Sequence, residues 1–220
     1  VIDIAFTVDA TGSMGDEMNY LKTELKDVVE RVKKDNPGVE VRIGLVFYRD
    51  EGDAYVVRSF PFTESLGEAL KNISDQHAAG GGDYPEAVHS GLAAAIDGLD
   101  WSKEARTKMN FLILDAPPHY QEGVLSSLQK SCESASEQGI RLVPVTASGI
   151  EKDTEFLMRF MAIATGGTYV FITDHSGIGN SHLEVDSTIG DYEVEFLNDL
   201  MVRLINEYSA ELSGEDLVVK

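Results

Sequence analysis

The chain has 220 residues, of which 43% are hydrophobic and 25% are charged, so it is long and apolar enough to bury a substantial core as one domain over residues 1–220. Its 38 acidic residues outnumber its 18 Lys and Arg residues and give a net charge of -20, which disfavours nucleic acid and anionic lipid surfaces as partners. A single cysteine excludes an intrachain disulfide and a thiolate-cluster metal site, and no apolar run reaches the roughly 18 residues of a membrane span.

The beginning of the chain predicts a strand, a tight turn and a helix. Residues 2–8 are a short, nearly continuous apolar run, which is typical of a central strand covered on both faces. The run stops at Asp9. From Met14 onward, apolar residues recur every three or four positions, which predicts a helix that ends at the Asn-Pro-Gly sequence of residues 36–38.

The middle of the chain predicts a hairpin, a helix and a glycine loop. Residues 39–48 and 55–62 are strand-like, and the connection between them is short enough for an antiparallel hairpin. Residues 64–77 predict a weak helix, because a glycine interrupts the pattern. Three successive glycines then precede Asp83, and Pro85 suits the first turn of the next helix.

The rest of the chain alternates between strands and helices, with a loop expected at residues 174–191. The expected strands are residues 110–114, 140–145 and 168–172, and the expected helices are residues 88–99, 124–138, 154–165 and 194–208. This alternation predicts an α/β fold. We expect a doubly wound, Rossmann-like, mostly parallel sheet with one antiparallel edge strand and helices on both faces.

The expected topology places two carboxylates at one edge of the sheet. In a doubly wound sheet the ligand crevice lies beyond the carboxyl ends of the strands, where the strand order reverses, and the first and fourth strands flank it. The hairpin supplies the second and third strands, so residues 110–114 form the fourth. The residues that end the two flanking strands are Asp9 and Asp115, and we expect their side chains to converge.

The turn after the first strand favours a metal ion between these carboxylates. Asp9, Thr11 and Ser13 place oxygen-bearing side chains at alternate positions, while Gly12 lets the backbone fold closely. Two carboxylates and two hydroxyls, with room for water, suit Mg²⁺ or Mn²⁺, whereas Ca²⁺ usually collects more oxygen ligands. The two negative charges balance a divalent cation, which can then accept an acidic group from a partner. A plain helix N-cap is the alternative interpretation of this turn.

Four segments together resemble the von Willebrand factor type A domain family. Residues 9–14 are similar to the Asp-x-Ser/Thr-x-Ser signature of its metal-ion-dependent adhesion site, and residues 80–86 resemble its second metal loop in the Gly-Gly-Gly-Asp-x-Pro-Glu form. Residues 111–115 resemble the strand that carries the last aspartate of the site, and residues 163–169 resemble the late helix-to-strand passage. These segments occur in the family's order and span nearly the whole chain.

The resemblance implies a metal site whose candidate ligands are Asp9, Thr11, Ser13, Asp83 and Asp115. In such a site Asp9 acts mainly through water. Ser13 binds directly, and so does Thr11 unless it only supports the direct ligands. Asp115 binds directly or through water, depending on whether a partner ligand is bound. Many family members have a threonine ligand in the second loop, where this chain has Gly82, so Asp83 is the nearest replacement. If Asp83 binds the metal, its charge should strengthen metal binding and weaken the attraction of an acidic partner.

The function implied by the resemblance is a non-enzymatic module that binds a protein partner through a metal-coordinated carboxylate, in an extracytoplasmic location. Two alternatives remain open. Asp9 also resembles the nucleophile of haloacid-dehalogenase-like phosphatases, which would make the chain a Mg²⁺-dependent phosphohydrolase, although Thr11 stands where those enzymes have a second aspartate. The metal could instead stabilise a structural subunit whose interface lies elsewhere.

Other polar residues near the expected crevice have simpler interpretations. We expect His119 to be a solvated loop histidine, and either Arg49 or Asp50 to support the ligands from outside. A solvated acidic rim is expected from Asp16, Glu17, Asp50, Asp53 and Glu86.

Overall fold

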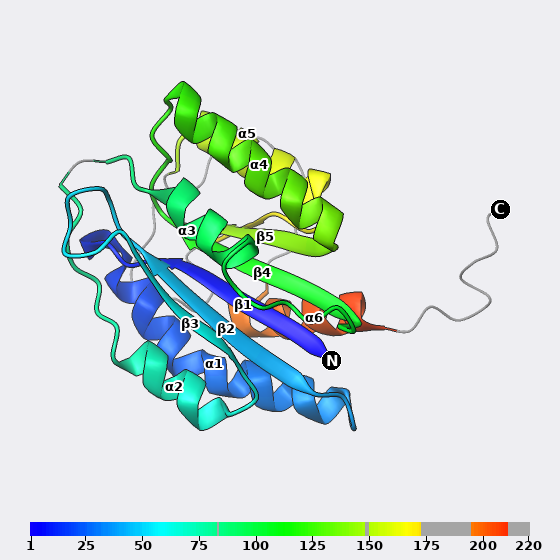
Figure 1. Ribbon diagram of the computed structural model, residues 1–220. Coiled ribbons are helices and arrows are strands. Elements are labelled where there is room, and N and C mark those ends of the chain that lie inside the picture. Colours follow the sequence, from blue (N-terminus) through cyan, green and yellow to red (C-terminus); the bar gives the residue numbers. More distant parts are fainter. Residues whose placement is uncertain (83, 148–149, 173–194, 211–220) are drawn as a thin grey trace.

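The computed structural model describes residues 1–82, 84–147, 150–172 and 195–210. Within these residues, six strands form one sheet in the order β3-β2-β1-β4-β5-β6, and each neighbouring pair is parallel except β2 and β3 (Figure 1). The strands are β1 (Ile2–Asp9), β2 (Val41–Tyr48), β3 (Val57–Thr63), β4 (Thr107–Leu114), β5 (Ile140–Thr146) and β6 (Val170–Phe171). This confirms the doubly wound α/β fold with one antiparallel edge strand.

Helices cover both faces of the sheet (Figure 1). The residues that pack on one face come from α1 (Gly15–Asp35), α2 (Leu66–Ser74) and α6 (Leu197–Ser209). Those that pack on the other face come from α3 (Val88–Ile96), α4 (Glu122–Gln138) and α5 (Lys152–Ala164). A short 3₁₀ turn, η1 (Gly12–Met14), connects β1 to α1. None of the described helices is both long enough and apolar enough to cross a membrane.

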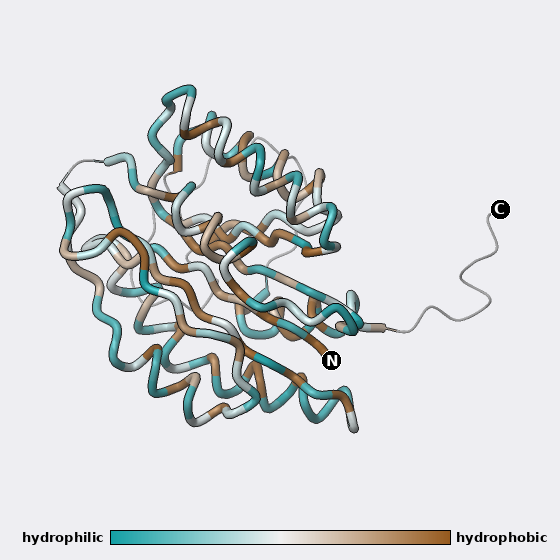
Figure 2. The backbone as a smooth tube through the Cα atoms, in the orientation of Figure 1, coloured by the Kyte–Doolittle hydropathy of each residue, from teal (hydrophilic) through white to brown (hydrophobic). Residues whose placement is uncertain are grey.

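Alternating strand side chains build a separate apolar core on each face. Phe6 of β1 and Phe111 of β4 stack with ring centroids 5.3 Å apart in the core under α1 and α6. The neighbouring residues Ala5 and Leu112 belong to the core under α3 and α4. Figure 2 shows the consequence, because the central strands are coloured mostly as hydrophobic along their length. Double-sided burial explains why these strands are continuously apolar in sequence.

Several predicted boundaries differ from the structure by two or three residues; β4, for example, begins at Thr107 instead of residue 110, and α3 ends at Ile96 instead of residue 99. Helix α2 ends at Ser74 instead of residue 77, and the Gln76 side chain beyond it donates to the Asn72 carbonyl and accepts a hydrogen bond from Arg58. Strand β6 is two residues long instead of five, because β5 pairs with it only at its last two positions. The expected loop at residues 174–191 and the expected start of the last helix at residue 194 lie outside the described residues.

The packing of α3 on β2 leads to a testable prediction. A Cβ at Gly91 of α3 would lie 2.4 Å from Cδ1 of Tyr48, a fully buried residue of β2. We expect Gly91→Ala to lower the free energy of unfolding by about 1–2 kcal/mol in urea denaturation, because overpacking outweighs the gain in helix propensity. Gly123→Ala in α4, where no atom lies within 4 Å, is the matched control and should cause no loss. Equal losses in both variants would contradict this account.

Candidate metal centre

Asp9, the last residue of β1, is completely buried. Asp9 Oδ1 accepts hydrogen bonds from the backbone N–H of Thr11 at 2.9 Å and from Thr11 Oγ1 at 2.7 Å. Asp9 Oδ2 is buried and has no hydrogen-bond partner within the described residues. In this part of the structure no side-chain hydrogen bond caps the N-terminus of η1 or α1. The alternating oxygen-bearing residues of the turn therefore do not serve as a simple helix cap.

Asp115 lies at the same edge of the sheet, directly after β4. Strands β1 and β4 are parallel neighbours, with Val8 opposite Ile113, so the segments that follow the two strands leave the sheet side by side. The Ser13 side chain forms a hydrogen bond with the Asp115 carboxylate, which links the two loops. Asp115 Oδ1 is buried and lacks a partner among the described residues. The two carboxylates that the topology placed at the crevice thus lie near each other.

The glycine loop packs directly on this turn. Gly12 N–H donates to the Gly80 carbonyl at 3.2 Å, and Ala79 N–H donates to the Ala10 carbonyl at 3.0 Å. Gly80 has a φ of 83°, and a Cβ there would lie 2.4 Å from Asp53 Oδ1. Asp53 also accepts a hydrogen bond from Gly81 N–H at 3.0 Å. The loop therefore requires glycine both for backbone conformation and for space.

These three loops enclose an open cleft of about 400 Å³. Its walls include the hydroxyls of Thr11 and Ser13, the carboxylates of Glu86 and Asp115, and the backbone of the three glycines. Thr11 is buried, whereas Ser13 is exposed at the cleft. No Lys, Arg or His side chain of the described residues lines the cleft. The cleft is therefore an oxygen-rich site with acidic side chains in its wall.

Glu86 is the residue of this site that the sequence interpretation missed. We expected it in a solvated rim, and this expectation was wrong, because its side chain is buried and its Oε2 has no partner in the described structure. The Glu86 N–H donates to the Pro117 carbonyl at 2.9 Å, and a parallel bridge joins Glu86 to Pro118. This bridge holds Glu86 against the loop after β4. The one sequence signal for Glu86 was its position as the final glutamate of the Gly-Gly-Gly-Asp-x-Pro-Glu motif.

The electrostatics of the cleft disfavour three ionised carboxylates without a counter-charge. Burial raises the pKa of Asp9 to about 7, against the opposing effect of the Thr11 hydrogen bonds and with a smaller contribution from Asp115. Burial, followed by repulsion from Asp9, raises the pKa of Glu86 to about 8. Burial also raises the pKa of Asp115. The buried Tyr48 hydroxyl faces these carboxylates, and burial is the main reason that its pKa is raised well above the usual value.

The other polar residues hold the loops in place. His119 Nε2 contacts Asp50 Oδ1 at 2.7 Å, and His119 itself is partly exposed. Asp50 is buried, so the expectation of a solvated Asp50 was wrong. Arg49 Nε donates to the Ala10 carbonyl at 3.0 Å, and its Nη2 donates to the His77 carbonyl at 2.7 Å. Glu17 is also buried rather than solvated, whereas Asp16 and Asp53 are partly exposed.

The donor set fits a hard divalent cation that uses hydroxyls as well as carboxylates. Among the described residues no three Asp, Glu, His or Cys side chains form a metal-binding group by themselves. The candidate ligand Asp83 lies outside the described residues. Gly82, at the position of the family's threonine, lines the cleft, and no atom lies within 4 Å of the place where its Cβ would be.

The amino-acid sequence of this chain matches a known protein family. The family model of the von Willebrand factor type A domain matches residues 3–181, which is more than half of the chain. The putative ariadne-like RING finger protein R811 of Acanthamoeba polyphaga mimivirus is 27% identical over 191 residues, covering 78% of this chain. This chain spans only 18% of the length of that relative. The family match confirms the resemblance carried by the sequence motifs.

Solved structures share the fold at low sequence identity. Proximal thread matrix protein 1 from the mussel byssus, with zinc occupying its MIDAS motif, superposes with a TM-score of 0.63 at 17% identity, over 94% of this chain and 46% of its own. The pilus adhesin SpaC from Lactobacillus rhamnosus GG, in its open conformation, superposes with a TM-score of 0.60 at 14% identity, over 94% of this chain and 29% of its own. At these identities the likeness shows the fold alone.

The glycine loop gives a prediction about the rigidity of the cleft. Gly80→Ala forces a positive φ on a residue with a Cβ and pushes it into Asp53, so we expect the metal-free protein to lose about 1–3 kcal/mol of unfolding free energy in urea. Gly82→Ala is the matched control, because its φ is not positive and its Cβ position is open, and it should change stability by less than about 0.5 kcal/mol. A Gly80→Ala variant as stable as the control would show that the loop adapts freely.

Proposed function

This chain belongs to the von Willebrand factor type A domain family, whose fold commonly mediates metal-dependent protein interaction or adhesion, and we propose that it binds a protein partner through a divalent cation in the cleft at the carboxyl edge of its sheet. One observation carries the proposal. Asp9, Glu86 and Asp115 each keep a buried oxygen without a hydrogen-bond partner in the described residues. Unpaired buried carboxylate oxygens are costly, and a cation offsets that cost.

We propose Asp9, Thr11, Ser13 and Asp115 as the ligand set, with Asp83 as the fifth candidate. Thr11 Oγ1 donates its proton to Asp9 at 2.7 Å, which leaves the lone pairs of that hydroxyl available to a cation. The hydrogen bond between Ser13 and the Asp115 carboxylate has the same effect. The protein thus orients two neutral oxygens and two carboxylates, and the metal supplies a positive charge that attracts an acidic group.

Mg²⁺ or Mn²⁺ suits this site best, because every donor is a hard oxygen and the set is small for Ca²⁺. Zinc in the MIDAS motif of the mussel byssus protein supports a divalent cation in a site of this kind. Glu86 adds a third carboxylate at the cleft wall, where its charge strengthens cation binding from outside the proposed ligand set.

The partner group that fits the cleft is a carboxylate from a protein. The cleft is open, and exposed Ser13 lies at its wall, so a side chain from outside can reach a bound cation. The pilus adhesin and the byssus matrix protein among the structural neighbours support adhesion and an extracytoplasmic location. The phosphohydrolase alternative is weaker, because phosphoryl transfer needs cationic side chains and none of the described residues places one in the cleft wall.

Metal binding tests the first part of this proposal. Protein stripped with EDTA should bind Mg²⁺ or Mn²⁺ in isothermal titration, and Asp9→Asn or Asp115→Asn should each weaken binding by more than about tenfold, or about 1.4 kcal/mol. Asp75→Asn removes an exposed carboxylate at the end of α2 and serves as the charge-matched control, with unchanged affinity. Wild-type protein that takes up neither metal, or variants that bind as well as wild type, would end the proposal.

Partner recognition tests the second part. We expect the wild-type protein to bind a subset of Asp- and Glu-containing peptides on an array in the presence of Mg²⁺, and to lose them in EDTA. Twin peptides with Asn or Gln in place of the acid should not bind, because a neutral amide is a poorer ligand for a hard cation. Asp115→Ala should lose the same peptides, and Asp75→Ala should keep them. Binding that survives both chelation and Asp115→Ala would instead support a metal with a purely structural role.

A further inference from the structure

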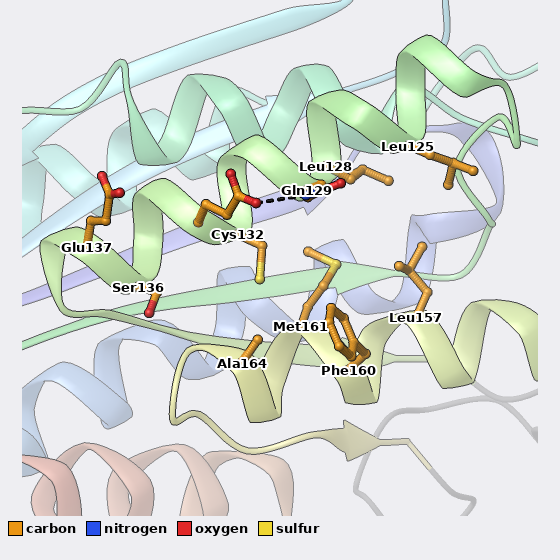
Figure 3. A pocket seen from close by; sticks show the side chains of 11 residues that line it. Leu125, Leu128, Gln129, Cys132, Ser136, Glu137, Leu157, Phe160, Met161 and Ala164 are labelled. Atoms are coloured by element: carbon orange, nitrogen blue, oxygen red, sulfur yellow. Dashed lines mark hydrogen bonds between the residues drawn. The ribbon is translucent and has the colours of Figure 1, made fainter.

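A second cavity of about 610 Å³ lies between α4 and α5. It shares no lining residue with the cleft around Thr11, Ser13 and Asp115, which we call the metal cleft. Figure 3 shows Cys132 on α4 and Leu157, Phe160 and Met161 on α5 directed toward the space between the two helices. Leu128 of α4 completes the apolar wall. We call this cavity the α4–α5 groove.

Large apolar side chains gather at this groove in exposed positions. Leu125 of α4 is 41% exposed and Phe160 of α5 is 57% exposed, and both line the groove. On α5, Phe156 and Ile163 lie four residues before and three residues after Phe160, and they are 74% and 78% exposed. The apolar surface therefore continues from the groove over the outer face of α5, and such a continuous patch is typical of an interaction surface.

The length of the groove fits a short helix. Its lining residues run from Leu125 to Glu137 on α4 and from Leu157 to Ala164 on α5, which correspond to lengths of about 18 Å and about 10 Å at the helical rise. The apolar lining residues of both walls recur at helical spacing. Three turns of an α-helix span about 16 Å, and the side-chain ridges of one helix pack into the grooves between the side chains of its neighbours.

The charge of the groove identifies the kind of helix. Glu133 and Glu137 lie one helical turn apart on the α4 wall, and no Lys or Arg is among the described lining residues. Gln129 Nε2 donates to Glu133 Oε1 at 2.8 Å, which restrains that carboxylate on the α4 side of the groove. Basic residues one turn apart on a docking helix would complement this pair.

We propose that the α4–α5 groove binds a cationic amphipathic helix of a partner protein, with its apolar face against Phe160 and Met161 and its basic residues against Glu133 and Glu137. A second copy of this chain is disfavoured by its net charge of -20. Residues 211–220 are disfavoured as well, because they carry three acidic side chains and one lysine, and they follow α6, which packs on the opposite face of the sheet. This inference does not depend on the metal centre.

Two synthetic helices of roughly 18 residues can test it. One has Leu on one face and Lys on the flanks, and the other has Glu in place of Lys. We measure binding to the full chain by fluorescence anisotropy at physiological salt with EDTA present, so that the metal centre does not contribute. The Lys peptide should bind and the Glu peptide should not. Phe160→Ser, and separately the double variant Glu133→Lys with Glu137→Lys, should each weaken binding by about tenfold or more.

Matched variants separate groove binding from general attraction to an acidic protein. Phe196→Ser removes a 58% exposed phenylalanine that precedes α6, and Glu64→Lys with Glu104→Lys makes the same charge change at exposed sites outside the groove. Both should retain binding. Equal weakening by groove and control variants would overturn the proposal, as would full binding by Phe160→Ser. Sedimentation that shows a wild-type dimer abolished by Phe160→Ser would overturn it in favour of a second copy.

Discussion

The parallel pairing of β1 with β4 is the constraint on which the candidate metal centre depends. These two strands meet where the strand order of the sheet reverses, and their carboxyl ends place Asp9 and Asp115 at one edge. Burial at this edge opposes ionisation and raises the pKa of both carboxyl groups. The hydroxyls of Thr11 and Ser13 hydrogen-bond to the carboxylates. The strand topology thereby creates an oxygen-rich site in which some acceptors have no partner among the described residues.

Several interactions that hold the loops around the site do not involve the proposed ligands. The Arg49 guanidinium joins the carbonyls of Ala10 and His77, and it also stacks on the Tyr55 ring with its carbon 4.5 Å from the centroid. Asp53 accepts the Gly81 N–H, and the Glu86 backbone pairs with the loop after β4. Because these contacts fix backbone rather than ligand atoms, the carboxylate oxygens stay available at the cleft.

The metal cleft and the α4–α5 groove use different physical chemistry on separate parts of one fold. The cleft is polar and lined by oxygen atoms, and the proposed cation would be selected there by charge and coordination. The groove is mainly apolar, with two glutamates on one wall, and its selectivity comes from shape and flanking charge. The two sites share no lining residue, so a change in one is not expected to alter the chemistry of the other.

The sequence by itself determined the order of strands and helices, the antiparallel hairpin, the family and the presence of Asp9 and Asp115 at the switch point, because these follow from local periodicity, turn residues and a fixed topology rule. Only the tertiary structure decided that Glu86 is buried in the cleft, that Asp50 pairs with His119, and that exposed apolar residues of α4 and α5 border one groove. The physical reason is that the burial of a loop side chain, or of a helix face, depends on which distant segment packs against it. Local sequence patterns carry no record of that packing.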